Sequence, residues 1–328
     1  MVETVDNRIK YIYEPIQAEL DRVVEMLRGI APQAGSSLKQ GVLDYAVMSG
    51  GKKLRPALTL LSAQFHPHDP TAPIIMATAV ELLHIASLVH DDTVDSSTIR
   101  RGRATVSSRW GGKVAVMLGD YLFATSATYV CDTGDIRVIR RFSEAIMELA
   151  RGELSEHFSL HNWDQTVADY EERTYDKTAS LFCTASECGA VLSGASESHC
   201  QALKAYGYHL GMAFQIMDDI LDFQGTEAEL GKPVGNDLLQ GTITLPALFF
   251  AQRYPDESVL ERLKKGGTDQ EDLRQMVEMV RNSPAIDETL AVADRYGHQA
   301  LEALGQLAPN QARSSLKELA SYITSRRG

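Results

Sequence analysis

Two acidic motifs, each embedded in strongly apolar sequence, lie 127 residues apart in this chain (218 − 91). Their six carboxylates belong to Asp91, Asp92 and Asp95 in HDDTVD and to Asp218, Asp219 and Asp222 in MDDILD. Residues three, four and seven apart share one face of an α-helix. In each D-D-x-x-D motif the first and last aspartates are four apart. We therefore expect two apolar helices, each with carboxylates along one face.

Aspartates at this spacing repel each other by about 0.2–0.5 kcal/mol per pair, so a nearby positive charge is expected. Carboxylates, water and phosphate oxygens are the usual ligands of Mg²⁺. A solvated acidic helix end would explain one such motif, but two copies inside apolar sequence would be costly to bury separately. The pattern predicts that the motifs face each other across a cavity holding divalent cations and a polyanion.

Composition excludes several classes of protein. The chain has 328 residues, of which 44% are hydrophobic and 23% charged, as in an ordinary globular protein. Its net charge of −12 argues against a general nucleic-acid binder. The four cysteines form no CxxC pair and follow no signal peptide, which predicts reduced thiols and a cytoplasmic location. No apolar run reaches the length of a membrane span, so no transmembrane segment is expected.

The rest of the chain reads as helical. Residues 4–30 carry aliphatic side chains at three- and four-residue steps, and residues 38–48 predict a second helix that ends at Gly50-Gly51. Alternating strand patterns with Asn-Gly or Asp-Gly turns are missing. No shift in composition marks a domain boundary. We expect one all-α domain over residues 1–328.

Basic residues follow glycines or acidic residues at several places. In GGKKLRP, two glycines precede Lys52 and Arg55 at an expected helix start, where the backbone can approach a phosphate closely. Arg100 and Arg101 follow the first motif, and guanidinium groups bind diphosphate oxygens in bidentate fashion. Lys177, followed by Thr178, and Lys232 lie elsewhere, and taken singly each also fits a surface lysine.

Five motifs together carry a resemblance to a known family. GGKKLRP, HDDTVDSSTIRRG, the Lys177-Thr178 pair, FQIMDDILD and GKPVGNDLLQG occur in the order seen in trans-isoprenyl diphosphate synthases, the polyprenyl synthetases. The resemblance implies an isoprenoid-synthase-type helical bundle around a large central cavity, usually built as a homodimer. It also implies a head-to-tail (1′-4) prenyltransferase that ionises an allylic diphosphate and joins it to isopentenyl diphosphate.

The resemblance further implies residue roles. The Mg²⁺ ligands, for three ions bound with the substrate diphosphate, would be Asp91, Asp92, Asp95, Asp218, Asp219 and Asp222. The cations of the allylic diphosphate pocket would be Arg100, Lys177 and Lys232. The isopentenyl diphosphate pocket would be formed by Lys52, Arg55, His84 and Arg101. The polar groups beside the developing carbocation would be Thr178 and Gln215.

Product length depends on the residues below the first motif. Ala86 and Ser87, five and four residues before Asp91, are small where short-chain enzymes of the family have aromatic rings. Leu83 is a candidate for a deeper wall. A helical turn adds about 5.4 Å of depth, roughly one isoprene unit. We expect an open channel and a product longer than farnesyl, that is, geranylgeranyl or longer.

Two alternatives stay open. A class I terpene cyclase shares the first motif, but it resembles a different second metal motif and needs no GGKKLRP segment. A catalytic or regulatory subunit of a heteromeric synthase is the other alternative. Regulatory subunits tend to lose metal carboxylates or basic residues, and both sets are present here.

Overall fold

The computed structural model describes residues 2–34, 37–48, 51–226 and 233–325. It is 78% helical, and the one strand pair of the described residues is a short hairpin of β1 (Ile99–Arg100) and β2 (Arg103–Ala104). The expected all-α class is confirmed. The chain forms two compact units. The first comprises Met1–Glu144, Thr184–Lys204 and Leu304–Glu318, and the second comprises Ala145–Cys183, Ala205–Ala303 and Leu319–Gly328.

Among the helices that the structure describes, four have residues in both units. They are α8 (Ile136–Phe158), α10 (Ser180–Leu192), α11 (Glu197–Gln224) and α18 (Gln311–Thr324). The second acidic motif lies in the part of α11 that belongs to the second unit, and the first acidic motif lies in the first unit. Each motif is therefore held by the packing of its own unit.

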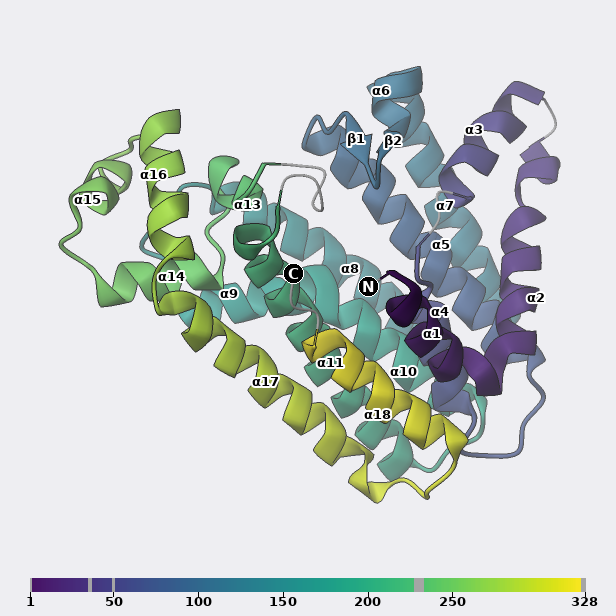
Figure 1. Ribbon diagram of the computed structural model, residues 1–328. Coiled ribbons are helices and arrows are strands. Elements are labelled where there is room, and N and C mark those ends of the chain that lie inside the picture. Colours follow the sequence, from purple (N-terminus) through teal and green to yellow (C-terminus); the bar gives the residue numbers. More distant parts are fainter. Residues whose placement is uncertain (1, 35–36, 49–50, 227–232, 326–328) are drawn as a thin grey trace. The chain divides into compact units, whose positions relative to one another are not determined.

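The first unit is built around α5 (Thr71–Val94), which packs against α2, α4 and α7 (Figure 1). Its helices before and after α5 are α1 (Val2–Tyr13), α2 (Gln17–Arg28), α3 (Ser37–Val47), α4 (Leu54–Ala63), α6 (Val106–Trp110) and α7 (Gly112–Asp132). The expected helix over residues 4–30 is interrupted by a 3-10 turn, Glu14–Ile16, because Pro15 has no backbone N–H to donate.

By length and composition alone, α5 and α7 could each cross a membrane. The apolar window of α5 is 72% buried inside the structure, as in a core helix, because helices cover it on several sides. The corresponding window of α7 is 33% buried. Its exposed face carries Val116, Met117 and Tyr121.

The second unit packs α14 (Leu245–Arg253) against α9 (Val167–Thr174), α16 (Gln270–Arg281) and α17 (Ala285–Ala303) (Figure 1). The short helix α13 (Asn236–Leu239) and α15 (Ser258–Lys264) pack on α16. Between α9 and α10 lies η3 (Tyr175–Ala179), a π-helix. This widened turn carries the Lys177-Thr178 pair.

Candidate active site

The first acidic motif forms the C-terminal end of α5. Asp91 is partly buried, Asp92 is 6% exposed, and Asp95, the residue after the last helical one, is exposed. The three carboxylates therefore differ in their access to solvent. The helical context predicted for the motif is confirmed.

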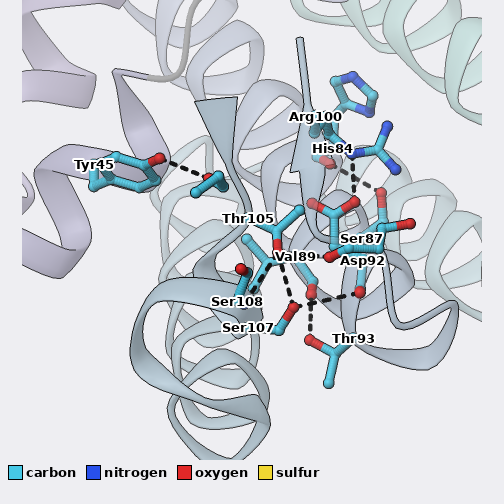
Figure 2. A network of polar contacts seen from close by, with 12 residues as sticks. Tyr45, His84, Ser87, Val89, Asp92, Thr93, Arg100, Thr105, Ser107 and Ser108 are labelled. Carbon is cyan, nitrogen blue, oxygen red and sulfur yellow. Dashed lines mark hydrogen bonds and ion pairs between the residues drawn. The ribbon is translucent and has the colours of Figure 1, made fainter. Parts of the chain in front are cut away.

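Asp92 is held by an ion pair. The Nε atom of Arg100, on strand β1, donates to Oδ1 of Asp92 at 2.6 Å (Figure 2). The backbone carbonyl of Asp92 accepts from the backbone N–H of Ser97 at 2.9 Å, which ties the chain after α5 back to the helix. Burial raises the pKa of Asp92, while Arg100 and Arg101 act in the opposite direction. The hairpin thus places an arginine against the middle aspartate of the motif.

Arg101 approaches the segment before α4. A Cβ atom on Gly51 would lie 2.7 Å from Nη1 of Arg101, so a side chain at this position would displace the guanidinium. Gly51 has a φ of +128°, which other residues rarely adopt. Lys52 is exposed and Arg55 is partly buried. The structure therefore places Gly51, directly before Lys52, beside the guanidinium group of Arg101.

His84 lies among the same cations. Burial lowers the pKa of His84 well below its usual value, and the charges of Arg55, Arg101, Arg100 and Lys53 lower it further. The imidazole is therefore neutral near pH 7 and can both donate and accept a hydrogen bond. Three of the four residues expected in the isopentenyl diphosphate pocket thus lie in one unit, with Arg55 and Arg101 close enough to His84 for their charges to lower its pKa.

In the second unit, a hydrogen-bonded chain leads to Asp219 on α11. Oγ1 of Thr178 donates to Oε1 of Gln215 at 2.8 Å, and Nε2 of Gln215 donates to Oδ1 of Asp219 at 2.8 Å. The hydroxyl of Tyr170, on α9, donates to Oδ2 of Asp219 at 2.6 Å. Both carboxylate oxygens of this buried aspartate therefore accept a hydrogen bond from a neutral partner.

The neighbourhood of Asp219 is rich in negative charge. Burial raises its pKa to about 8, and the carboxylates of Asp237 and Asp218 raise it as well. The hydrogen bonds from Tyr170 and Gln215 lower the pKa of Asp219, each by less than burial raises it. A cation bound at this end of α11 would therefore be attracted by several carboxylates.

Asp222 accepts hydrogen bonds from the backbone at the start of α13. Its Oδ2 accepts from the backbone N–H of Asp237 at 3.1 Å, and its backbone carbonyl accepts from Gly235 at 2.8 Å. These bonds hold the start of α13 against the end of α11. Lys232, expected in the allylic diphosphate pocket, lies outside the described residues.

Lys177 on the π-helix is paired with α8. Its Nζ lies 2.6 Å from Oε1 of Glu156 and 3.2 Å from Oε2 of Glu153. The lysine thus has carboxylate partners in its own unit, which its sequence context did not predict.

The three residues expected to set product length differ in exposure. Leu83 and Ala86 are fully buried, whereas Ser87 is partly exposed and donates its hydroxyl to the carbonyl of His84 at 2.9 Å. Ser87 lies one helical turn before Asp91 and shares its face of α5. Among these three, Ser87 is the most exposed to solvent.

Comparison with known proteins identifies the family. The polyprenyl synthetase profile matches residues 37–280. The chain belongs to the polyprenyl synthetase family. It is 37% identical over 321 residues to component 2 of heptaprenyl diphosphate synthase from Geobacillus stearothermophilus, covering 97% of this chain and 99% of that one. It is 32% identical over 280 residues to octaprenyl diphosphate synthase from Haemophilus influenzae, covering 84% of each.

Solved structures agree with this polyprenyl synthetase in fold. Heptaprenyl diphosphate synthase from Staphylococcus aureus matches with a TM-score of 0.90 and 35% identity, over 94% of this chain and 98% of that one. A decaprenyl diphosphate synthase from Rhodobacter capsulatus matches with a TM-score of 0.88 and 32% identity, over 97% and 99%. The expected isoprenoid-synthase fold is confirmed, and the protein is a trans-prenyltransferase.

The donor set of the polyprenyl synthetase fits magnesium, which the family uses with diphosphate substrates. Both motifs offer carboxylate oxygens, the hard ligands that Mg²⁺ prefers. Within the described residues, no group of three or more His, Cys, Asp or Glu side chains is arranged to hold a metal ion. Magnesium is commonly held by one or two carboxylates together with water and substrate phosphates, so this arrangement fits an ion that arrives with the substrate.

Sequence reasoning missed several residues of the site. Tyr170 lies 49 residues from Asp219, and Glu156 lies 21 residues from Lys177. These distances follow no helical spacing, so no periodic pattern could link the partners. The Asp92–Arg100 pair spans eight residues around a hairpin. For this pair, the arginines that closely follow the acidic motif indicate an ion pair in the sequence itself.

Proposed function

We propose that this polyprenyl synthetase joins an allylic diphosphate to isopentenyl diphosphate, head to tail, and extends the chain beyond farnesyl. The observation that carries the proposal is the grouping of Arg55, Arg100 and Arg101 around His84, directly beside Asp92. A metal-binding motif next to an arginine cluster suits two diphosphates, one bound with metal and one bound by cations alone.

Asp91 and Asp95 of the first motif and Asp218 of the second would contact Mg²⁺ and the allylic diphosphate. When bound, the metal, in a cluster of three ions, supplies charge neutralisation for the departing diphosphate. Asp91 and Asp218 are each partly exposed and Asp95 is exposed, so solvent reaches all three carboxylates. Arg100, Lys177 and Lys232 would bind the remaining diphosphate oxygens.

The middle aspartates would orient these groups. Asp92 is engaged by Arg100, and Asp219 is engaged by Tyr170 and Gln215. A ligand group that is hydrogen-bonded on its far side keeps its orientation, and such partners tune a metal site. Asp222, hydrogen-bonded to the backbone of Asp237, would hold the start of α13 in the same way.

Isopentenyl diphosphate would bind to Lys52, Arg55, His84 and Arg101. With its pKa far below 7, His84 is neutral, so it would donate one hydrogen bond to a phosphate oxygen without adding charge. Thr178 and Gln215, hydrogen-bonded to each other, would present oxygen atoms to the allylic cation. Holding the alkene near that cation lowers the entropic part of the barrier. The departed diphosphate would take the proton that ends each cycle.

The product would be geranylgeranyl diphosphate or longer. Ser87 is small and reachable on the face of Asp91, so the growing tail can pass at least one helical turn below the diphosphate. Relatives named as heptaprenyl, octaprenyl and decaprenyl diphosphate synthases support a long product.

Both units would work as one prenyltransferase domain in a cytoplasmic homodimer. The exposed apolar face of α7, with Val116, Met117 and Tyr121, supports a second copy as the partner of the first unit. The second candidate is a subunit of a heteromeric synthase, favoured by the name component 2 of a relative that is 37% identical. Light scattering of the purified chain, together with its activity when alone, separates the two.

The test is prenyl transfer by the purified chain with Mg²⁺, farnesyl diphosphate and labelled isopentenyl diphosphate, followed by chromatography of the products. We expect label in products longer than farnesyl, and none when Mg²⁺ is removed. Diphosphate release without isopentenyl diphosphate would instead indicate a terpene cyclase. A chain that is inactive alone but active with a second component is a heteromeric subunit, and growth that stops at farnesyl refutes the open channel.

A further inference from the structure

The Lys177-Thr178 pair lies on an irregular turn. The π-helix η3 spans Tyr175–Ala179 between α9 and α10. A π-turn holds one more residue than an α-helical turn, and isolated π-turns often mark functional sites. If η3 relaxed to a regular α-helix, Lys177 would rotate by about 100° relative to α10, and its Cα would move by about 3.5 Å. The position of Lys177 and Thr178 therefore depends on what maintains the turn.

An ion pair with one buried partner holds Asp176, the second residue of the turn. Nε of Arg151, on α8, donates to Oδ2 of Asp176 at 2.6 Å, and its Nη2 donates to Oδ1 at 2.5 Å. The side chain of Asp176 is 1% exposed, whereas that of Arg151 is 56% exposed. The backbone carbonyl of Asp176 accepts from Oγ of Ser180 at 2.8 Å. The bidentate geometry fixes the carboxylate in both position and orientation.

The next residues of α8 contact the next residues of the turn. A Cβ on Gly152 would lie 2.7 Å from the backbone nitrogen of Lys177, so the two backbones touch. Glu153 then lies 3.2 Å from the ammonium group of Lys177. Three consecutive residues of α8 thus contact two consecutive residues of the turn. Arg151 binds the carboxylate of Asp176, Gly152 touches the backbone of Lys177, and Glu153 pairs with its ammonium group. This register leaves little freedom for η3 to shift along α8.

We propose that Arg151 and Asp176 are positioning residues of the prenyl transfer reaction. Their ion pair maintains the π-turn, and the π-turn directs Lys177 and Thr178 to the allylic diphosphate and the cation formed from it. This inference rests on the proposed function of that pair, and neither Arg151 nor Asp176 contacts substrate in it.

The competing explanation is that the pair only stabilises the fold. A buried ion pair is weak evidence for net stability, because desolvation offsets much of the attraction between the charges. A purely structural pair would change the amount of folded enzyme, and thus kcat, without changing either KM. A positioning pair would change the kinetics toward the allylic diphosphate alone.

The experiment compares Asp176→Asn and Arg151→Lys with the wild type. Asp176→Asn removes the charge and one acceptor, and Arg151→Lys keeps the charge but loses the fork. We expect kcat/KM for the allylic diphosphate to fall by about tenfold to hundredfold, since a misplacement of about 1 Å can cost that much. The KM for isopentenyl diphosphate should stay within about twofold. Calorimetric affinity for inorganic pyrophosphate with Mg²⁺ should fall along with kcat/KM, which gives a readout without turnover.

Asp272→Asn is the matched control. Asp272 forms a comparable fork with Arg262 in the same unit, with Nη2–Oδ1 at 2.6 Å, and none of its contacts involves η3. Its kinetics should match the wild type. Two results would overturn the proposal. One is a folded variant with wild-type kinetics, and the other is a variant whose kcat falls while its KM and its pyrophosphate affinity stay unchanged. If Asp176→Asn fails to fold, the kinetics of Arg151→Lys test the proposal. The side chain of Arg151 is half exposed, so its replacement should leave the protein folded. A wild type without prenyl transfer refutes the proposed function instead.

Discussion

The side chain of His90, directly before the first acidic motif, packs against Gly119 of α7. The ring occupies the position that a Cβ atom would take at residue 119. A Cβ on Gly119 of α7 would lie 2.1 Å from Nε2 of the His90 ring and 2.3 Å from its Cδ2. The ring stacks on Phe123, with centroids 5.6 Å apart and planes at 19°. Nε2 lies 3.1 Å from the carbonyl oxygen of Val116, to which it donates. The side chain therefore ties the end of α5 that carries Asp91 to α7.

We predict that Gly119→Ala destabilises the protein by about 1–2 kcal/mol. Alanine normally stabilises a helix interior relative to glycine by about 0.5–1 kcal/mol. Here the ring must move out, which loses a hydrogen bond of about 0.5–1.5 kcal/mol and a stacking contact of similar size. The added methyl group also strains a packed contact, at a cost of about 1–3 kcal/mol if the ring stays. Destabilisation should outweigh the gain in helix propensity.

Urea unfolding of a double-mutant cycle measures this effect. In a His90→Ala background the same Gly119→Ala change meets no ring, so it should stabilise the protein by about 0.5–1 kcal/mol. The control is Gly41→Ala in α3, where no described atom lies within 4 Å of the new Cβ, and a gain of about the same size is expected. An equal effect of Gly119→Ala in both backgrounds would refute the steric argument.

Three further predictions concern the site. Ser87→Phe should shorten the product to about farnesyl length, because the ring would project one turn below Asp91; unchanged products on chromatography would remove Ser87 from the tail's route. In the unfolded chain His84 takes up a proton below about pH 6.5, whereas in the folded protein its lowered pKa keeps it neutral. The free energy of unfolding should therefore fall as the pH drops below that value, by at most about 1.4 kcal/mol per pH unit. His84→Asn should flatten that acid limb in urea titrations, and an unchanged limb would assign it to other groups. Glu156→Gln removes one carboxylate from Lys177 and should lower the KM for the allylic diphosphate several-fold, with the KM for isopentenyl diphosphate as the internal control.

Local patterns in the sequence predicted the helices well. The spacing of Asp91 and Asp95 fixes a helical face, and α5 contains that face together with the apolar run before it. The second motif lies in α11 for the same reason. Helical periodicity is a local property, so it survives in a single sequence. The break at Pro15 was not predicted, although proline cannot donate a backbone hydrogen bond and therefore interrupts the helix expected over residues 4–30.

Contacts between distant helices could not be predicted in this way. The π-turn that carries Lys177 depends on Arg151, which lies 25 residues before its partner Asp176 on another helix. Neither residue is unusual in its own segment, and a single arginine or aspartate in a helix most often faces water. Tertiary packing decides whether such a pair forms. The same limit applies to the hydrogen bond from Tyr170 to Asp219.

The two motifs look alike in sequence but are electrostatically different. In the first, the middle aspartate has a cationic partner, Arg100, which opposes the rise in its pKa caused by burial. In the second, the partners of Asp219 are neutral and other carboxylates lie close, so burial dominates and its pKa reaches about 8. A site that recruits Mg²⁺ with its substrate gains most where negative charge is least compensated by the protein. We therefore predict that the second motif depends more strongly on bound cations than the first, although both share the same D-D-x-x-D pattern.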